Sequence, residues 1–338
     1  MNRFVVISTL VLYATLICIS CDKESKVGNV NCQCFERADS TDEEKFVGIE
    51  NISFENYPKV DGSTSARALN MVVACKLLNL RYAWSGGVGG IEEWSAAPYQ
   101  EESIPEDFFG ERIKTSQTNG AFMNLIDGDV DIILTHRTIS PDEKTHADNA
   151  GVTLIETPIA LDAFVFIVNR TNKVKSLSVS QVQGIYTKRI TNWSQVGGKN
   201  VNIQALTRPR NSGSEEVFRE VVMNGLKPAE FSPPYVINPM WVLLDIIINN
   251  ENSIGYTFYN YKEVIARKSC NEVPVLAING ICPDENMVKN GKYPFISKVH
   301  VAIRSDLDHN SVAYKLYEWL QSENAAHTIA ECGFIPKQ

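Results

Sequence analysis

Three short clusters of Ser, Thr and Gly occur where a strand-like pattern gives way to a helix-like one. They lie at residues 61–65, 116–120 and 208–214. The first N–H groups of a helix lack backbone partners and lie at the positive end of its dipole, so hydroxyls and glycine there let an anion approach bare donors. Ordinary N-capping explains each cluster alone. All three together, one of them beginning with Arg208, predict a site for a small tetrahedral anion.

Length and charge narrow the class of protein. The chain has 338 residues, 44% of them hydrophobic and 21% charged, with a formal net charge of −8. A chain of this size can build a large core, most simply as two domains, and its composition argues against disorder. The negative charge gives no basic footprint, so we expect no nucleic-acid partner. An anion site must therefore depend on local dipoles and a few arginines, because the overall field repels anions.

The N-terminus has the pattern of an export signal. A basic start, an apolar run at residues 4–19 and a small residue before Cys21 are typical of a secretory signal peptide over residues 1–21. Ser20 directly before Cys21 is similar to a bacterial lipoprotein box, although Cys18 stands where that box usually has Leu. We expect lipidation of Cys21, with simple secretion as the alternative. Residues 22–48 are predicted to form a polar tether.

Export makes disulfides possible. Cys270 and Cys282 bracket a short segment, and they could pair as a loop staple. Cys32 and Cys34 lack a second Cys or His pair at zinc spacing, so no metal site is expected. Cys75 lies on an apolar helix pattern, which favours a buried small side chain.

Strand and helix patterns alternate along the chain, which predicts an α/β architecture with mixed or parallel sheets. Residues 82–110 contain Gly pairs and acidic residues, and we expect them to be an irregular surface excursion. Strands near 163–168 and 294–301 are candidate hinges between two lobes. The predicted helices cover residues 65–80, 116–126, 179–186 (with a capping box of Ser178 and Gln181), 214–222, 239–248 and 314–332.

Several stretches, weak alone but strong in their order and spacing, carry a family resemblance. They are residues 61–69, 176–186, 190–198, 208–214, 253–256, 293–294 and 316–336. Together they resemble the phosphate-binding-protein family of bacterial ABC importers, from about Tyr57 to the C-terminus. The resemblance implies a two-lobe type II periplasmic-binding-protein fold, with a ligand cleft between lobes joined by two hinge strands. Lobe I would be residues 49–165 with 295–338, and lobe II residues 166–294.

The resemblance also implies a ligand set and no cofactor. Carried over by position, the phosphate ligands would be Ser63, Thr64, Ser65, Thr118, His136, Arg137, Arg208, Ser212, Gly213 and Ser214. A buried dianion needs nearly every oxygen paired, and bonds from Arg208 and backbone N–H groups are the strong, charge-assisted kind.

One departure bears on which anion fits. After the strand at 130–134 the family often has an acidic residue that accepts the proton of hydrogen phosphate, whereas this chain has His136 followed by Arg137. A neutral His136 could accept a proton, and an imidazolium could only donate. Asp61 is a possible substitute acceptor or a turn residue. Arg210 stands where the family commonly has an acid, so selectivity for phosphate over sulfate stays open.

The residues and the resemblance favour a binding protein. We expect an exported, lipid-anchored protein on the periplasmic or cell-surface side of a bacterial membrane, delivering phosphate to the permease subunits of an ABC transporter. Alternatives are another oxyanion such as sulfate, or a ligand-sensing or partner-binding surface lipoprotein. Enzymatic activity is not expected, because Ser212 lacks the Gly-x-Ser-x-Gly elbow and none of the five histidines has a recognisable partner spacing.

Overall fold

The computed structural model describes residue 32 and residues 46–86, 93–266 and 271–337. Cys21, the predicted signal peptide and all of the predicted tether except Cys32 and residues 46–48 lie outside these residues. Within the described part of the chain, no helix is long and apolar enough to cross a membrane. Among the same residues, no group of three or more His, Cys, Asp or Glu side chains could hold a metal ion.

Strands and helices alternate along the first half of the chain, as predicted. The 3₁₀ turn Thr64–Ala66 runs directly into α1, so the first cluster begins a continuous helical segment. The elements are β1 (Val60–Gly62), α1 (Arg67–Leu77), β2 (Tyr82–Gly86), β3 (Trp94–Pro98), α2 (Phe108–Arg112), α3 (Gln117–Asp127), β4 (Ile132–Thr135), α4 (Pro141–Ala150), β5 (Leu154–Val168), β6 (Ser176–Leu177) and α5 (Val179–Tyr186).

The second half continues the alternation. Helix α6 passes without a break into the π-helical turn Phe218–Met223, which lengthens the helical segment that follows the third cluster. The elements are β7 (Gln204–Ala205), α6 (Gly213–Val217), α7 (Met240–Asn249), β8 (Ser253–Phe258), β9 (Ala277–Ile278), α8 (Glu285–Lys289), β10 (Ile296–Arg304), α9 (Val312–Gln321), α10 (Glu323–Glu331) and β11 (Ile335–Pro336).

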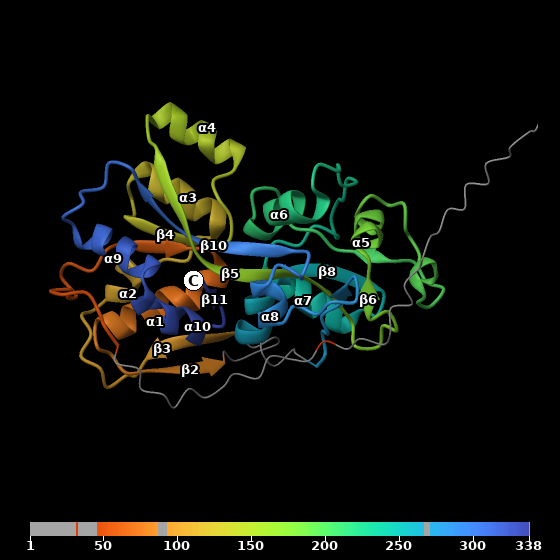
Figure 1. Ribbon diagram of the computed structural model, residues 1–338, viewed down its shortest axis with the longest axis horizontal. Helices are drawn as coiled ribbons and strands as arrows, with labels where there is room; N and C mark the ends of the chain where they lie inside the picture. Colours follow the sequence, from red (N-terminus) through yellow and green to blue (C-terminus); the bar gives the residue numbers. More distant parts are fainter. Residues whose placement is uncertain (1–31, 33–45, 87–92, 267–270, 338) are drawn as a thin grey trace, which may run out of the picture.

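A seven-stranded mixed sheet runs through the molecule in the order β1-β4-β10-β5-β8-β7, with β11 also paired to β5. Strand β5 changes partners along its length: it pairs with β10 up to Ala163 and with β8 from Phe164 onward. In Figure 1, β5 and β10 extend between a group of elements that contains α1, α3 and α9 and another that contains α5, α6 and α7. The mixed α/β fold predicted from the sequence is confirmed.

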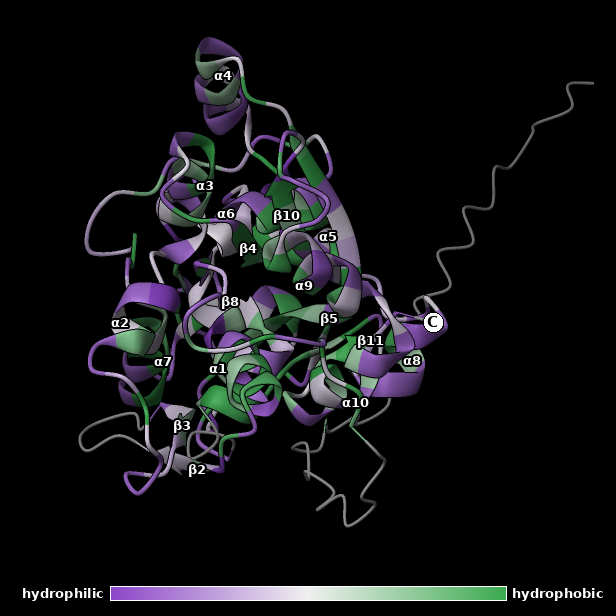
Figure 2. Cartoon of the chain, turned by 90° about the vertical axis from the view of Figure 1, so that its left-hand side faces the viewer, coloured by the Kyte–Doolittle hydropathy of each residue, from purple (hydrophilic) through white to green (hydrophobic). Residues whose placement is uncertain are grey.

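The buried apolar residues form separate cores at the two ends of β5. One core gathers aromatic side chains such as Phe166, Phe218 and Tyr256. A second lies around Leu69 and Trp319, under α1, α9 and α10. A smaller cluster lies under α3, on the other face of the sheet from the second core. Ile133 of β4 belongs to it, because successive side chains of a strand point to opposite faces. Figure 2 shows β10 as hydrophobic and the outlying helix α4 as largely hydrophilic.

Helix caps read from the sequence are present. Ser178 accepts the N–H of Gln181 at 3.1 Å, and the Gln181 side chain accepts the N–H of Ser178 at 2.8 Å, which completes the predicted capping box of α5. Pro239 is the N-cap of α7, as the predicted start of that helix requires. Cys75 is buried on α1, as expected of a small apolar side chain.

The expectation of an irregular excursion at residues 82–110 is wrong for residues 82–86 and 94–98. Strands β2 and β3 form an antiparallel hairpin with Tyr82 opposite Pro98 and Gly86 opposite Trp94. Its strands combine Tyr82, Trp84 and Trp94, which favour strands, with Gly and Ala, which do not, and contacts with the rest of the fold add to its stability. Ala96 is buried against the second core, and the Tyr82 hydroxyl donates to Glu331 at 2.5 Å.

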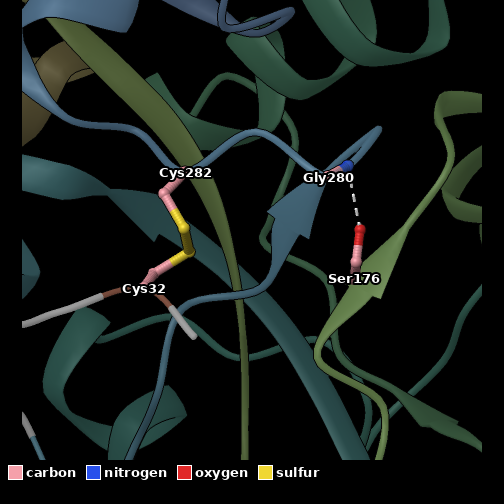
Figure 3. Close-up of a disulfide and its surroundings, with 4 residues drawn as sticks. All are labelled: Cys32, Ser176, Gly280 and Cys282. Atoms are coloured by element: carbon pink, nitrogen blue, oxygen red, sulfur yellow. Dashed lines mark hydrogen bonds between the residues drawn. A yellow bond between two sulfur atoms is a disulfide. The ribbon is translucent and has the colours of Figure 1, made fainter. Parts of the chain in front are cut away.

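The possible pairing of Cys270 with Cys282 does not occur. Cys282 is bonded to Cys32, 250 residues away in the sequence, and Cys270 lies outside the described residues (Figure 3). Close by, the Ser176 hydroxyl accepts the N–H of Gly280 at 3.1 Å, where β6 pairs with β9. The bond therefore attaches Cys32 to the part of the molecule that contains β6, β9 and α8. This pairing could not be found from distance along the sequence, because only the folded chain brings Cys32 and Cys282 together.

Candidate functional site

The three clusters identified in the sequence meet at one cavity of about 390 Å³. Its wall is made by residues 63–65, 117–119, 208–214 and 238–241, together with Glu93 and Phe258. Eight of the ten predicted ligands line it: Ser63, Thr64, Ser65, Thr118, Arg208, Ser212, Gly213 and Ser214. The remaining two, His136 and Arg137, lie behind this wall.

The first cluster is fixed by a close backbone approach and a buried carboxylate. A Cβ on Gly62 would lie 2.7 Å from the Leu134 carbonyl oxygen, so only glycine fits beside β4. The Asp61 carboxylate accepts the N–H of Gly62 at 2.7 Å and the N–H of Ser116 at 2.8 Å. Asp61 therefore joins the first cluster to the second. It has the turn role considered from the sequence and does not line the cavity.

The second cluster begins α3 with an unusual backbone conformation. Gln117, the first residue of α3, has a φ of 64°, a region that non-glycine residues rarely adopt. Asn211 in the third cluster has the same φ of 64°. Both line the cavity, and residues with such conformations concentrate at ligand sites.

Arg208 is the buried cation of the site. It is only 8% exposed, and within the described chain its Nε and Nη1 atoms have no hydrogen-bond partner. Burial lowers the pKa of the guanidinium, with Tyr256, Tyr261 and Glu215 opposing that effect. The Tyr256 hydroxyl accepts the Arg208 N–H at 3.0 Å and donates to Glu215, which pins the loop. A buried cation with unpaired donors is costly unless an anion joins it.

Hydroxyl groups surround the same space. Among the described residues, the Ser214 Oγ atom is buried without a partner, so its hydrogen can point to a ligand. Ser212 is the N-cap of α6 and accepts the Glu215 N–H at 3.3 Å, which leaves its own O–H as a donor. The cavity thus offers a guanidinium, hydroxyl donors and the starts of helical segments to one small anion.

Arg137 is neutralised by a carboxylate. Its Nη1 and Nη2 atoms each lie 2.7 Å from an oxygen of Glu143, and both side chains are buried. Nη2 also donates to the Asn211 carbonyl at 3.0 Å, across the space between α4 and the third cluster. The predicted second cationic ligand therefore does not line the cavity itself, although its partner Asn211 does. Its observed contacts are structural and connect the two parts of the molecule.

His136 is buried between Ser65 and an acidic residue that the sequence analysis did not consider. Its Nδ1 atom lies 2.9 Å from Ser65 Oγ and 3.4 Å from Ser63 Oγ. Its Nε2 atom lies 3.2 Å from Asp162 Oδ2. The ring therefore lies behind the wall, in hydrogen-bond contact with the serines and packed against the lining residue Phe258 at 4.2 Å between ring centroids.

Close contacts join the two sides of the cavity. Besides Arg137 and Asn211, the Asn211 side chain donates to Asp142 at 3.1 Å. A Cβ on Gly213 would lie 2.4 Å from Thr118 Oγ1, so α6 approaches α3 so closely here that a larger residue would displace the Thr118 side chain or separate the helices. Residues from the two ends of β5 therefore enclose the cavity together.

Sequence reasoning missed two kinds of lining residue. Glu93, next to the hairpin, accepts the Tyr261 hydroxyl and lies 3.4 Å from Arg67. Nothing in its sequence surroundings indicates this, because the placement of the hairpin creates the contact. Trp241, in the first turn of α7, lines the cavity and is 47% exposed. Pro239 before an apolar helix was the available signal for a further helix start at the site.

This geometry, with two sides of a mixed α/β fold closing over a cavity of anion donors, defines a solute-binding class of protein. A family model described as a PBP superfamily domain matches residues 107–324. Since that match covers more than half of the chain, the chain belongs to the PBP superfamily.

Particular relatives point the same way. The phosphate-binding protein PstS of Bacillus subtilis (strain 168) is 27% identical over 184 residues, which is 54% of this chain and 58% of that protein. Protein SphX of Synechococcus elongatus is 24% identical over 249 residues, 70% of this chain and 73% of that protein. The resemblance to the PstS-like family inferred from the sequence is confirmed.

Solved structures share the fold. A putative phosphate ABC transporter substrate-binding protein with bound phosphate from Clostridium perfringens aligns with a TM-score of 0.62 at 22% identity, covering 85% of this chain and all of that one. An ABC-type phosphate transport receptor from Vibrio cholerae aligns with a TM-score of 0.56 at 20% identity, covering 83% of this chain and all of that one. At these identities the likeness concerns the fold.

Proposed function

We propose that this protein is an extracytoplasmic solute-binding protein that captures inorganic phosphate in the cavity and delivers it to an ABC permease. The observation that carries the proposal is Arg208, a buried guanidinium with unpaired donors facing hydroxyls and helix starts. The names of the relatives, PstS and an ABC transporter substrate-binding protein, support phosphate as the ligand. The proposed role is to bind and release phosphate without catalysing a reaction.

The proposed ligand set follows the lining of the cavity. Ser63, Thr64 and Thr118 would donate from one side, and Arg208 with Ser212, Gly213 and Ser214 from the other. Such donors can pair most oxygens of a dianion, which burial requires. His136 and Arg137 are assigned supporting roles behind these residues, because Ser65 and Asp162 engage the ring nitrogens of His136 and Glu143 engages both Nη atoms of Arg137.

We also propose lobes with the predicted boundaries, residues 49–165 with 295–338 and residues 166–294. The two separate cores and the change of partners along β5 support a division near residue 164. A ligand that contacts both lobes favours the closed arrangement by its differential affinity. Export and a lipid anchor at Cys21 complete the proposal and rest on the sequence pattern.

Hydrolysis is the second candidate, because one arrangement favours it. Ser65, His136 and Asp162 have the residue types of a catalytic triad and lie in hydrogen-bonded order. A binding role predicts no turnover of phosphate or carboxylate esters. Turnover that is lost in Ser65→Ala would contradict that role.

Isothermal titration calorimetry on the chain without residues 1–21 tests phosphate binding. We expect wild-type protein to bind phosphate and Arg208→Ala to lose at least about 100-fold in affinity, since charge-assisted bonds of a buried cation contribute about 1.5–3 kcal/mol each. Arg210→Ala is the matched control, because Arg210 also lines the cavity but is exposed, and it should cost less than about tenfold. Binding of neither phosphate nor sulfate would refute the proposal.

A further inference from the structure

The cavity is larger than an inorganic phosphate ion needs. Even if each non-hydrogen atom of the ion is given the volume of a water molecule in the liquid, about 30 Å³, the ion fills only about 150 Å³. The cavity measures about 390 Å³, which lies within the range of about 300–1,000 Å³ typical of sites for small organic molecules. More than half of the space therefore remains beside a bound phosphate.

This surplus space does not come from a separation of the two sides of the cavity. Arg137 Nη2 donates to the Asn211 carbonyl at 3.0 Å, and the Asn211 side chain donates to Asp142 at 3.1 Å. A Cβ on Gly213 would lie 2.4 Å from Thr118 Oγ1, so the helices that carry these two residues also touch. The space is thus present while the two sides are in contact.

One wall of the cavity is apolar. Pro239, Met240 and Trp241 line it next to the anion donors. An inorganic anion gains nothing from such side chains, because it has no apolar surface to bury. Trp241 is 47% exposed, whereas the other tryptophans of the chain are buried or half-buried. A large exposed indole inside a ligand cavity is a surface that part of a ligand can cover.

The start of α7 holds Trp241 at this wall. Pro239 is the N-cap of the helix, and Met240 is buried in the aromatic core at the same end of β5. The Met240 sulfur also accepts the Thr257 hydroxyl at 3.2 Å. The first turn of α7 is therefore anchored on both its apolar and its polar contacts, and it presents Trp241 to the cavity.

We propose that the cavity also accepts phosphomonoesters that carry a planar apolar group, with this group against Trp241 and the phosphoryl head among Arg208 and the hydroxyls. The inference rests on the proposed function, because the head would use the same donors as inorganic phosphate. A phosphomonoester has P–O–C in place of the P–O–H of hydrogen phosphate, so near pH 8 both ions have three unprotonated oxygens and a charge of about −2. The donors can therefore hold either head, and the organic group makes the difference in affinity.

Calorimetry at about pH 8 tests this with inorganic phosphate, methyl phosphate and phenyl phosphate as ligands. We expect phenyl phosphate to bind at least about fivefold more tightly than methyl phosphate, because stacking on an aromatic side chain contributes at least that factor. Trp241→Ala should lower the affinity for phenyl phosphate at least about fivefold and leave the affinity for phosphate within about twofold. Phenylphosphonate, whose P–C bond cannot be hydrolysed to release phosphate, should behave as phenyl phosphate does.

Two further variants make the comparison specific. Trp241→Phe keeps an aromatic ring at the wall, so it should retain most of the affinity for phenyl phosphate. Tyr235→Ala is the matched control, since Tyr235 is 40% exposed but lies outside the residues that line the cavity. Its loss should change the affinity for neither ligand.

The outcomes separate this inference from the proposed function. If wild-type protein binds neither phosphate nor the esters, the proposed function fails. If it binds phosphate but neither phenyl phosphate nor phenylphosphonate, or binds methyl and phenyl phosphate equally, only the inference about esters is overturned. A Trp241→Ala variant that weakens phosphate and phenyl phosphate alike also overturns it. So does one that changes neither affinity, as expected of a tryptophan that serves only to contact another protein.

Discussion

Replacing Gly213 with alanine tests whether the two sides of the cavity meet when ligand is bound. The new Cβ would lie 2.4 Å from Thr118 Oγ1, well inside the 3.0 Å that real Cβ contacts essentially never cross. Thr118 is buried, so either its side chain must rotate or α6 must move away from α3. Overpacking of this kind costs about 1–3 kcal/mol, which corresponds to phosphate binding weaker by about 5- to 150-fold.

In Gly213→Ala we expect phosphate affinity to fall without a loss in the free energy of unfolding. Gly213 is not among the glycines with positive φ, so alanine suits its backbone, and Gly→Ala at such a position stabilises by about 0.4–1 kcal/mol. If the lobes can open, calorimetry should show weaker phosphate binding while the free energy of unfolding in urea is unchanged or higher. Gly110→Ala is the control, because nothing lies within 4 Å of its Cβ position.

A double variant identifies the contact responsible. Thr118→Ala removes Oγ1, so Gly213→Ala should cost less in that background than in the wild type, giving a coupling between the two sites. Phosphate binding by Gly213→Ala that equals wild type would refute the reasoning. It would mean that α3 and α6 do not approach this closely in the bound state.

Three further predictions concern the scaffold around the site. Arg137→Met leaves Glu143 buried and unpaired, and should lower the free energy of unfolding in urea by about 3 kcal/mol or more; a loss under about 1 kcal/mol would contradict burial of the pair. Burial lowers the pKa of His300 from 6.5 to about 4, so the unfolded chain binds the proton more readily than the folded chain does. The free energy of unfolding should therefore fall as the pH drops below 6.5 toward 4, by at most about 3 kcal/mol. His300→Gln should reduce this loss in urea titrations at several pH values, and an unchanged profile would contradict the assignment. Cys32→Ser should lower the free energy of unfolding by about 2–5 kcal/mol, and native thiol counts showing Cys282 reduced would contradict the disulfide.

The sequence was informative where local chemistry decides the outcome. The three hydroxyl and glycine clusters all lie at helix starts, although only Ser212 of the third cluster caps a backbone N–H with its side chain. The cap of Ser178 with Gln181 formed as predicted. The family resemblance then placed those starts around one cleft. Eight of the ten predicted ligands line the cavity.

The sequence was silent where long-range packing decides. Arg137 resembled a ligand, but Glu143 reaches it from α4 and satisfies its charge. His136 follows β4 directly, yet its partner Asp162 lies on β5, and only the sheet brings them together. The same applies to Glu93 and to the disulfide of Cys32, whose partners are remote in the sequence.

A crystal structure of the protein grown with phosphate tests the central claim most directly. The account predicts one phosphate in the cavity, within hydrogen-bond distance of the Arg208 guanidinium, with Thr64 donating from one side and Ser214 from the other. It also predicts a phosphate oxygen near Ser65 Oγ, with no direct contact to His136 or Arg137. Phosphate bound elsewhere, or an empty cavity at saturating phosphate, would contradict the account.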